Sequence, residues 1–197
     1  FKYKENKLHC EDVNLSKIAS SFGTPAYVYS KKALTENALM YVNSFTNPDN
    51  MACFSVKSLS NLSVLKLLKE VGCGFDVVSG GEMHRALSIG ADPKSIIFSG
   101  VGKSSDEIKQ GILNKILSFN VESVSELYKI EAIAKKLKMN ASVSIRFNPD
   151  IDSGGHDYIT TGRKGDKFGI SSIEDILNLS TYISKSPNLS MVGLACH

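Results

Sequence analysis

The chain has 197 residues, of which 42% are hydrophobic and 22% charged, and its formal net charge is +3. This is an ordinary globular composition. The net charge is small and the lysines are scattered among acidic residues, so the sequence does not form the basic stripe that is typical of a nucleic-acid-binding protein. The apolar runs are far shorter than the roughly 20 residues that a membrane-spanning helix needs. The opening residues FKYKENKLHC show no signal peptide.

The cysteine and histidine spacings exclude two further classes of protein. The four cysteines, at positions 10, 53, 73 and 196, fit neither a CxxC metal knuckle nor a small disulfide framework. The histidines show no HxxxH or HExxH spacing, so we predict no metal site. Reduced thiols are typical of the cytoplasm, and we therefore expect a cytoplasmic protein.

The first 30 residues differ in pattern from the rest of the chain. We predict a short helix over Leu15–Phe22, a turn at Gly23-Thr24-Pro25 and a strand over residues 26–29. This segment is followed by a regular alternation that starts near residue 51.

In that alternation, a short apolar run is followed by an amphipathic stretch whose apolar residues recur every three or four positions. We predict strands over residues 52–56, 75–79, 96–99, 117–121, 142–147 and 192–196. We predict helices over residues 62–71, 82–89, 105–114, 125–137 and 173–183. Ser123 with Glu126 three residues later is a capping-box pattern that supports one of these helix starts.

Alternating strands and helices with apolar strands indicate an α/β fold with a parallel sheet covered by helices. Six such strands suit either a doubly wound sheet or most of a (β/α)8 barrel. Polar, glycine-rich residues recur at the carboxyl end of nearly every strand, where barrel enzymes place their chemistry, and no GxGxxG follows the first strand. Both features favour the barrel.

Lys57 closes the apolar run Met51 to Val56, and lysine is rarely buried without a partner. At the carboxyl end of a barrel strand a lysine can be desolvated, which leaves a nucleophilic amine for a Schiff base with an aldehyde. The alternative is a lysine whose ammonium simply reaches the surface.

Asp76 and Arg146 interrupt two other apolar strands, and His197 ends a third. Single charges in buried strands are costly, so Lys57, Asp76 and Arg146 together predict a polar cavity at one end of the barrel. The alternative is a buried ion-pair network without a ligand.

Two glycine-containing motifs could in principle bind an anion. Ser79-Gly80-Gly81 at a helix start could hold an anion or only permit a tight turn, and GVGKS lacks P-loop spacing. We predict one long loop over residues 150–167, and such loops are usually functional or mobile.

An ordered series of motifs then resembles one known family. CFSVKSLSNLSVLKLL, GFDVVSGGE, IIFSGVGKS, FNVES, the HDYITTG and KFGI run, and GLACH resemble the fold-type III pyridoxal-phosphate decarboxylases, and among them the diaminopimelate decarboxylase branch. The resemblance extends from GTPAYVY to His197. It implies a (β/α)8 barrel over residues 31–197, incomplete at its carboxyl end, and a second β-domain to which residues 1–30 contribute.

The resemblance also implies roles for the four site residues. Lys57 stands where the family's lysine carries pyridoxal 5'-phosphate, and His197 where a histidine ring packs on the pyridine face. Asp76 matches a carboxylate near the cofactor, and Arg146 a basic residue of the same pocket. Lys57 and His197 are then the catalytic residues, and all four bind cofactor.

The implied activity is decarboxylation of meso-diaminopimelate to L-lysine, the last step of lysine biosynthesis. The implied partners are a small amino-acid substrate and a second copy of the chain, in a homodimer that shares its active sites, with no nucleic acid and no membrane. Alternatives within the fold are an ornithine or arginine decarboxylase or an amino-acid racemase. An alternative from another class is a non-catalytic regulator, against which the retained Lys57 and His197 argue. Because six strands cannot close an eight-stranded barrel, we expect the chain to be part of a longer polypeptide.

Overall fold

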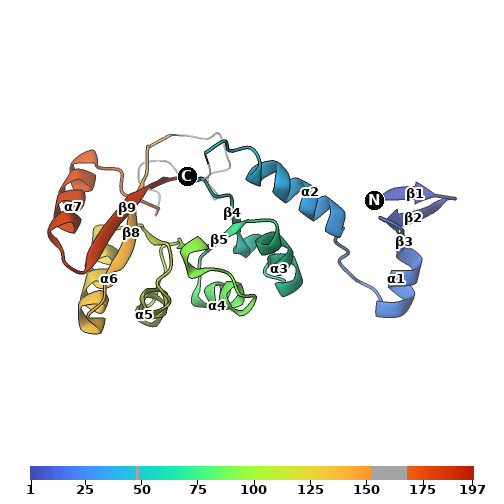
Figure 1. Cartoon of the computed structure of the whole chain (residues 1–197), viewed down its shortest axis with the longest axis horizontal. Helices are drawn as coiled ribbons and strands as arrows, with labels where there is room; N and C mark the ends of the chain where they lie inside the picture. Colours follow the sequence, from blue (N-terminus) through green and yellow to red (C-terminus); the bar gives the residue numbers. More distant parts are fainter. Residues whose placement is uncertain (48, 152–167) are drawn as a thin grey trace. The chain divides into compact units, whose positions relative to one another are not determined.

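The computed structural model describes residues 1–47, 49–151 and 168–197, so most of the predicted long loop lies outside the described residues. The chain divides into two compact units. One consists of Phe1–Ala52 with Lys66–Cys73, and the other of Cys53–Leu65 with Gly74–His197. Figure 1 shows the elements of both.

The first unit begins with a small antiparallel sheet of β1 (Lys2–Lys4), β2 (Lys7–Cys10) and β3 (Val13–Asn14), followed by α1 (Leu15–Phe22) and α2 (Lys31–Val42). A carboxylate oxygen of Glu11, in the turn after β2, accepts from the Ser30 hydroxyl at 2.8 Å and from the Lys32 amide at 2.9 Å. These bonds connect the start of α2 to the sheet. They also hold the pKa of Glu11 below its usual range, the Lys32 amide being the larger cause.

The structure confirms the helix over Leu15–Phe22 and corrects the rest of the first segment. Residues 26–29 form no strand, and the hairpin and α2 had no predicted counterpart. The strands of this hairpin are too short and too rich in lysine to show apolar alternation. In α2 only Ala38 is buried, so the sequence shows no apolar face of helical period.

The second unit is built on a parallel sheet of six strands in chain order. The strands are β4 (Cys53–Ser55), β5 (Gly74–Val77), β6 (Ile96–Phe98), β7 (Ser118–Val121), β8 (Ala141–Phe147) and β9 (Leu189–Cys196). The helices that follow the first five of these are α3 (Leu62–Glu70), α4 (Gly80–Ser88), α5 (Ser105–Asn114), α6 (Val124–Leu137) and α7 (Ile173–Lys185). Short 3-10 turns lie at η1 (Val56–Ser58) and η2 (Pro93–Ser95).

The parallel α/β sheet predicted from the strand and helix alternation is therefore confirmed, with its strands in the predicted places. The largest shift is in β9, which begins at Leu189 and not at residue 192. In the described residues β4 and β9 are the two edges of an open sheet.

The core of this unit lies between the sheet and helices α4 to α7, which follow one another along the outside of the strands in Figure 1. Alternate strand residues face this layer and are almost completely buried, for example Phe75, Phe98 and Phe119. Each such side chain contributes about 1.5–3 kcal/mol through burial. The other face of the strands carries smaller and polar side chains, and this is the face on which the candidate site is built.

The same strand-to-helix turn occurs twice in this unit, in FDVVSGGE and FNVESVSE. Ser79 and Ser123 cap the following helices by accepting from the amides of Glu82 and Glu126. Each glutamate in turn accepts, at 2.8 Å, from the backbone amide four residues before it. The carboxyl ends of β5 and β7 are thereby held by side chains of their own helices.

Candidate functional site

A cavity of about 250 Å³ lies at the carboxyl ends of the parallel strands. Its lining includes all four residues predicted from the sequence, namely Lys57, Asp76, Arg146 and His197. They come from four different strands or strand ends, so the sheet brings together an amine, a carboxylate, a guanidinium and an imidazole. Asp76 and Arg146 both line the cavity and do not face the helix layer.

Lys57 lies in η1, one residue beyond the buried Val56 that follows β4. Its side chain is exposed, so the described residues do not desolvate the amine, contrary to our expectation from the apolar strand. The chain leaves the strand geometry at Ser55 and turns before it reaches the lysine. This turn places Lys57 at the rim of the cavity.

Asp76 is held by hydroxyl groups of its two neighbouring strands. The Ser99 hydroxyl donates to one carboxylate oxygen at 2.5 Å, and the Ser55 hydroxyl donates to the other at 3.4 Å. The Asn120 amide nitrogen donates to the Ser99 hydroxyl at 3.0 Å. The carboxylate therefore has a fixed orientation on the cavity side of β5.

Arg146 forms an ion pair with Glu122 at 3.0 Å, with the glutamate side chain only 2% exposed. The guanidinium also stacks over the Phe168 ring, 4.9 Å from its centre. Glu122 accepts in addition from the Gly100 amide at 3.0 Å and the Gly169 amide at 3.1 Å. The buried carboxylate of Glu122 thus fixes Arg146 and the two loops that contain Gly100 and Gly169. Arg146 is therefore ion-paired with Glu122 and not with Asp76.

A second buried ion pair supports the loop after β6. The ammonium of Lys103 lies 2.6 Å from Glu126 and donates to the carbonyl oxygens of Gly100 at 2.6 Å and Asn120 at 2.8 Å. The Lys103 side chain is only 1% exposed. This lysine of GVGKS therefore fixes the cavity wall, in agreement with the rejection of a P-loop.

His197 and the exposed thiol of Cys196 border the cavity at the end of β9. The neighbouring residue Ala195 pairs in register with Arg146 of β8. This pairing brings the end of β9 to the same level of the sheet as the guanidinium. The imidazole thus lies on the same side of the sheet as the other three groups.

The glycines after β5 do not form an anion site. The Gly80 amide donates to Glu107 at 2.6 Å, and this bond and one from the Ser104 amide hold the pKa of Glu107 below its usual range. A Cβ at Gly80 would lie 2.8 Å from Cγ of Glu107, so a glycine permits the close approach of α4 and α5. Of the two readings left open for Ser79-Gly80-Gly81, the structure favours the tight turn.

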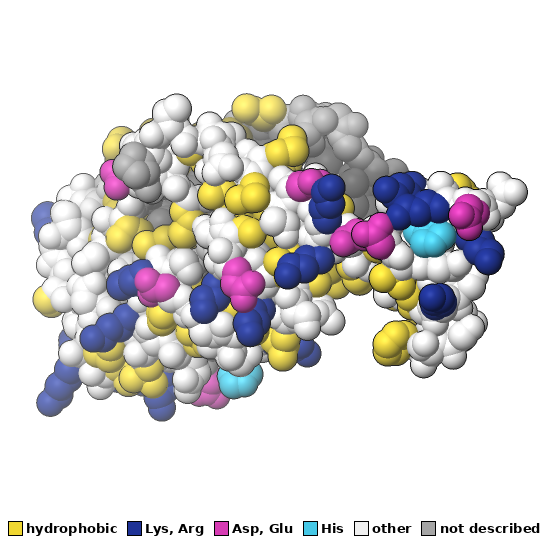
Figure 2. All heavy atoms as spheres, turned by 45° about the vertical axis from the view of Figure 1, so that its right-hand side comes forward, with side chains coloured by type: hydrophobic (Ala, Val, Ile, Leu, Met, Phe, Trp, Pro, Cys, Tyr) yellow, Lys and Arg dark blue, Asp and Glu magenta, His cyan; other side chains and the backbone are white. Residues whose placement is uncertain are grey.

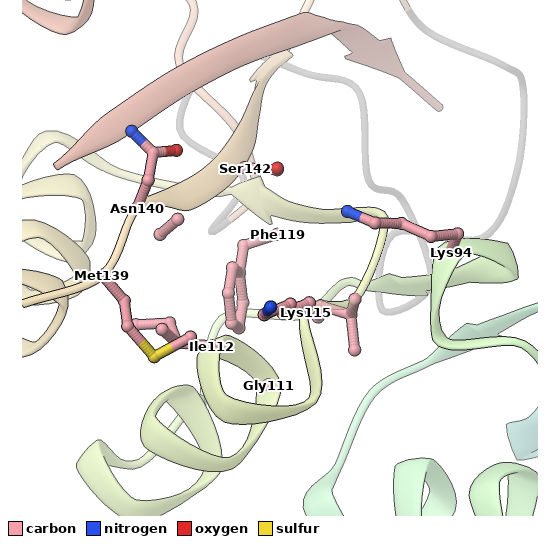
Figure 3. Close-up of a pocket in the computed structure, with 10 residues that line it drawn as sticks. Lys94, Gly111, Ile112, Lys115, Phe119, Met139, Asn140 and Ser142 are labelled. Carbon is pink, nitrogen blue, oxygen red and sulfur yellow. The ribbon is translucent and has the colours of Figure 1, made fainter. Parts of the chain in front are cut away.

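A larger cavity, of about 410 Å³, lies at the amino ends of β7 and β8 (Figure 3). Lys94 and Lys115 border it, and the Phe119 ring points toward the turn of α5 that contains Gly111. Among the described residues its lining includes no carboxylate and no imidazole. Because barrel chemistry occurs at the opposite end of the strands, we place the candidate site in the smaller cavity.

Two further observations concern ligands and surfaces. Within residues 1–47, 49–151 and 168–197, no three histidine, cysteine, aspartate or glutamate side chains are grouped as a metal would require. His156 lies outside these residues. No helix in the described part of the chain is long and apolar enough to span a membrane. On the face shown in Figure 2, lysine and arginine side chains are interspersed with acids.

Three residues of the site had no predicted role, although they lie in the motifs IIFSGVGKS and FNVES: Ser99, Asn120 and Glu122. Glu122 directly follows a strand predicted to be buried, and that position was the available signal for a paired carboxylate. The partners of these residues lie 21 to 47 positions away, so their contacts had no local pattern.

Comparison with known proteins gives the family. Residues 31–197 match the family described as "Pyridoxal-dependent decarboxylase, pyridoxal binding domain". Over all 197 residues the chain is 43% identical to the diaminopimelate decarboxylase of Haemophilus influenzae, and over 190 residues, or 96% of the chain, 44% identical to that of Neisseria meningitidis. In each case the match covers 47% of the relative, so the chain spans about half the length of these proteins.

Solved structures give the same result. Diaminopimelate decarboxylase from Helicobacter pylori in complex with L-lysine is 40% identical, with a TM-score of 0.88 over 93% of this chain and 46% of that one. The enzyme from M. jannaschii with L-lysine is 32% identical, with a TM-score of 0.88 over 100% of this chain and 47% of that one. The chain therefore belongs to the pyridoxal-dependent decarboxylase family, and its residues 31–197 match the pyridoxal-binding domain of that family.

Proposed function

We propose that the chain is the cofactor-carrying part of an enzyme that decarboxylates meso-diaminopimelate to L-lysine. The observation that carries this proposal is the convergence of Lys57, Asp76, Arg146 and His197 on one cavity at the carboxyl ends of the strands. The substrate assignment rests on relatives named diaminopimelate decarboxylase that are 43% and 44% identical over all or nearly all of the chain.

The residues of the cavity fit pyridoxal 5'-phosphate. An exposed primary amine at the rim is the group that an aldehyde requires, and a carboxylate and a guanidinium in fixed orientations offer an acceptor and a donor. When bound, this cofactor supplies an aldehyde that joins an amine and a ring that accepts the electron pair released with CO2.

In this site each residue of the chain has a defined task. Lys57 would hold the cofactor through its primary amine, which borders the cavity. Arg146 presents positive charge from a rigid position because Glu122 and Phe168 hold its guanidinium. His197 presents a flat ring at the end of β9, where it packs against a planar ligand. Asp76 provides an acceptor in a fixed orientation in the same cavity.

We extend the proposal to the assembly. The open edges of β4 and β9 support a complete (β/α)8 barrel that further strands close, because unpaired edges expect neighbours. Residues 1–30 then belong to a second β-domain and residues 31–197 to the barrel. The complete enzyme is proposed to be a cytoplasmic homodimer whose subunits share the active sites.

Carbon dioxide release from each candidate substrate tests the proposed reaction. With the complete protein and pyridoxal phosphate, we expect release from meso-diaminopimelate and none above background from ornithine or arginine. Lys57→Ala should abolish this release, whereas Lys66→Ala, an exposed lysine of α3, should leave it unchanged. Carbon dioxide release from ornithine or arginine alone would contradict the proposed substrate. Racemisation without carbon dioxide release would contradict the proposed reaction.

A further inference from the structure

Three consecutive strands present a connected set of polar side chains to the candidate site. Asp76 of β5, Ser99 at the end of β6 and Asn120 of β7 all line the cavity, and each is hydrogen-bonded to the next. Phe98 of β6 pairs in register with Phe119 of β7. The residues that follow these two, Ser99 and Asn120, therefore lie side by side. We refer to these three residues as the relay.

The direction of the hydrogen bonds in the relay is determined by its ends. The amide nitrogen of Asn120 can only donate, so the Ser99 oxygen accepts from it at 3.0 Å. The single proton of the Ser99 hydroxyl is then committed to Asp76, 2.5 Å away. The Ser99 hydroxyl therefore donates to Asp76 and not to a ligand, and as a donor it acts on the site through the carboxylate.

The other end of the carboxylate is connected to the strand that carries Lys57. Ser55, which pairs in register with Asp76, donates to its second oxygen at 3.4 Å. Lys57 lies two residues further along the chain. The carboxylate is therefore oriented from both sides, on the face of the sheet where the lysine amine borders the cavity.

The hydrophobic core does not require this polar arrangement. The neighbours of the relay along the strands, such as Phe75, Phe98 and Phe119, form the buried layer against the helices. The relay faces the cavity and is only partly buried, and small apolar residues would fill such positions without the cost of partly desolvating polar groups. Polar side chains kept at such a cost indicate a task at the site.

We propose that Ser99 and Asn120 are positioning residues, which orient the Asp76 carboxylate toward the nitrogen that Lys57 contributes to the bound cofactor. This inference rests on the proposed function. A carboxylate in a fixed orientation stabilises the protonated form of a nearby nitrogen more than a freely rotating one does. Loss of the relay should therefore let that nitrogen lose its proton at a lower pH.

The visible absorbance band of the cofactor-loaded complete protein, titrated with pH, measures this protonation. We expect Ser99→Ala to lower the midpoint by up to about one pH unit, because the lost hydrogen bond orients Asp76 and affects the nitrogen only through that carboxylate. Asn120→Leu should lower it less, because Ser99 can still donate to Asp76. If Asn120 acts through Ser99, the double variant Ser99→Ala/Asn120→Leu should have the same midpoint as Ser99→Ala. Ser99→Thr keeps the hydroxyl and should have the wild-type midpoint.

Ser118→Ala is the matched control. Ser118 lies on β7 and is hydrogen-bonded to Ser144 of β8 at 2.9 Å, but neither lines the cavity. The control should lower the melting temperature of the cofactor-free protein and leave the midpoint unchanged. An unchanged midpoint in Ser99→Ala, an equal shift in Ser118→Ala, or additive shifts in the double variant would each overturn the positioning role. A wild-type protein that shows no visible band would overturn the proposed function itself, and the relay with it.

Discussion

The buried ion pair between Lys103 and Glu126 allows a quantitative test of how the cavity wall is held. Replacing Lys103 with methionine keeps an unbranched side chain in a site where the lysine is 1% exposed. It removes the cation 2.6 Å from Glu126 and the donor to two backbone carbonyls. Removing one partner of a buried pair costs about 3–5 kcal/mol. We expect the lower end, about 3 kcal/mol, because Glu126 keeps its bond from the Glu122 amide.

Urea-induced unfolding of the complete protein, followed by circular dichroism, measures this loss. The double variant Lys103→Met/Glu126→Gln should be more stable than Lys103→Met by about 1 kcal/mol or more, because no unpaired charge stays buried and the glutamine oxygen still accepts from Glu122. Lys135→Met, an exposed lysine on the same helix as Glu126, should change stability by less than about 0.5 kcal/mol. A loss below about 1 kcal/mol in Lys103→Met, the value of an exposed pair, would refute the reasoning. So would a double variant less stable than the single one.

Three further predictions concern packing and titration. Gly111→Ala places a Cβ 2.5 Å from the Phe119 ring, so we expect about 1–3 kcal/mol of destabilisation in the same unfolding assay, and an unchanged midpoint would contradict this. The hydrogen bond to Glu131 raises the pKa of Tyr182 to about 12. This hydrogen bond therefore stabilises the fold fully below pH 10, and the stabilisation is lost as the pH rises toward 12. Ultraviolet titration should show the raised pKa of Tyr182 and its return toward 10 in Glu131→Gln. The hydrogen bonds that lower the pKa of Glu107 stabilise the fold above pH 4.5, its usual pKa, and this stabilisation is lost as the pH falls through the lowered pKa. The free energy of unfolding should therefore decrease less steeply toward acidic pH in Glu107→Gln than in the wild type.

The elements that the sequence predicted well are those whose signals are local. The helix predicted over residues 105–114 is confirmed as α5, and the structure adds a reciprocal capping box of Ser104 and Glu107 that was not predicted. At α6 the predicted Ser123 cap is present, but Glu126 accepts from Glu122 in place of the cap residue. The alternation of strands and helices was sufficient for a parallel sheet.

The features that the sequence did not predict depend on contacts between distant residues. The first hairpin turns at Glu5 and Asn6, two residues with positive φ at a place without glycine, so the usual turn signal was missing. Asp76 and Arg146 were predicted because charges interrupt apolar runs. Their partners Ser99 and Glu122 directly follow other strands, β6 and β7, and these pairs follow only from the register of the sheet.

The attachment of pyridoxal phosphate to Lys57 is the central claim, and chemical trapping tests it most directly. The complete protein is loaded with the cofactor, reduced with borohydride, digested and mapped by mass spectrometry. The account predicts that the label is on the peptide that contains Val56-Lys57 and is absent in Lys57→Ala. A label on another lysine, or release of the cofactor on reduction, would contradict it.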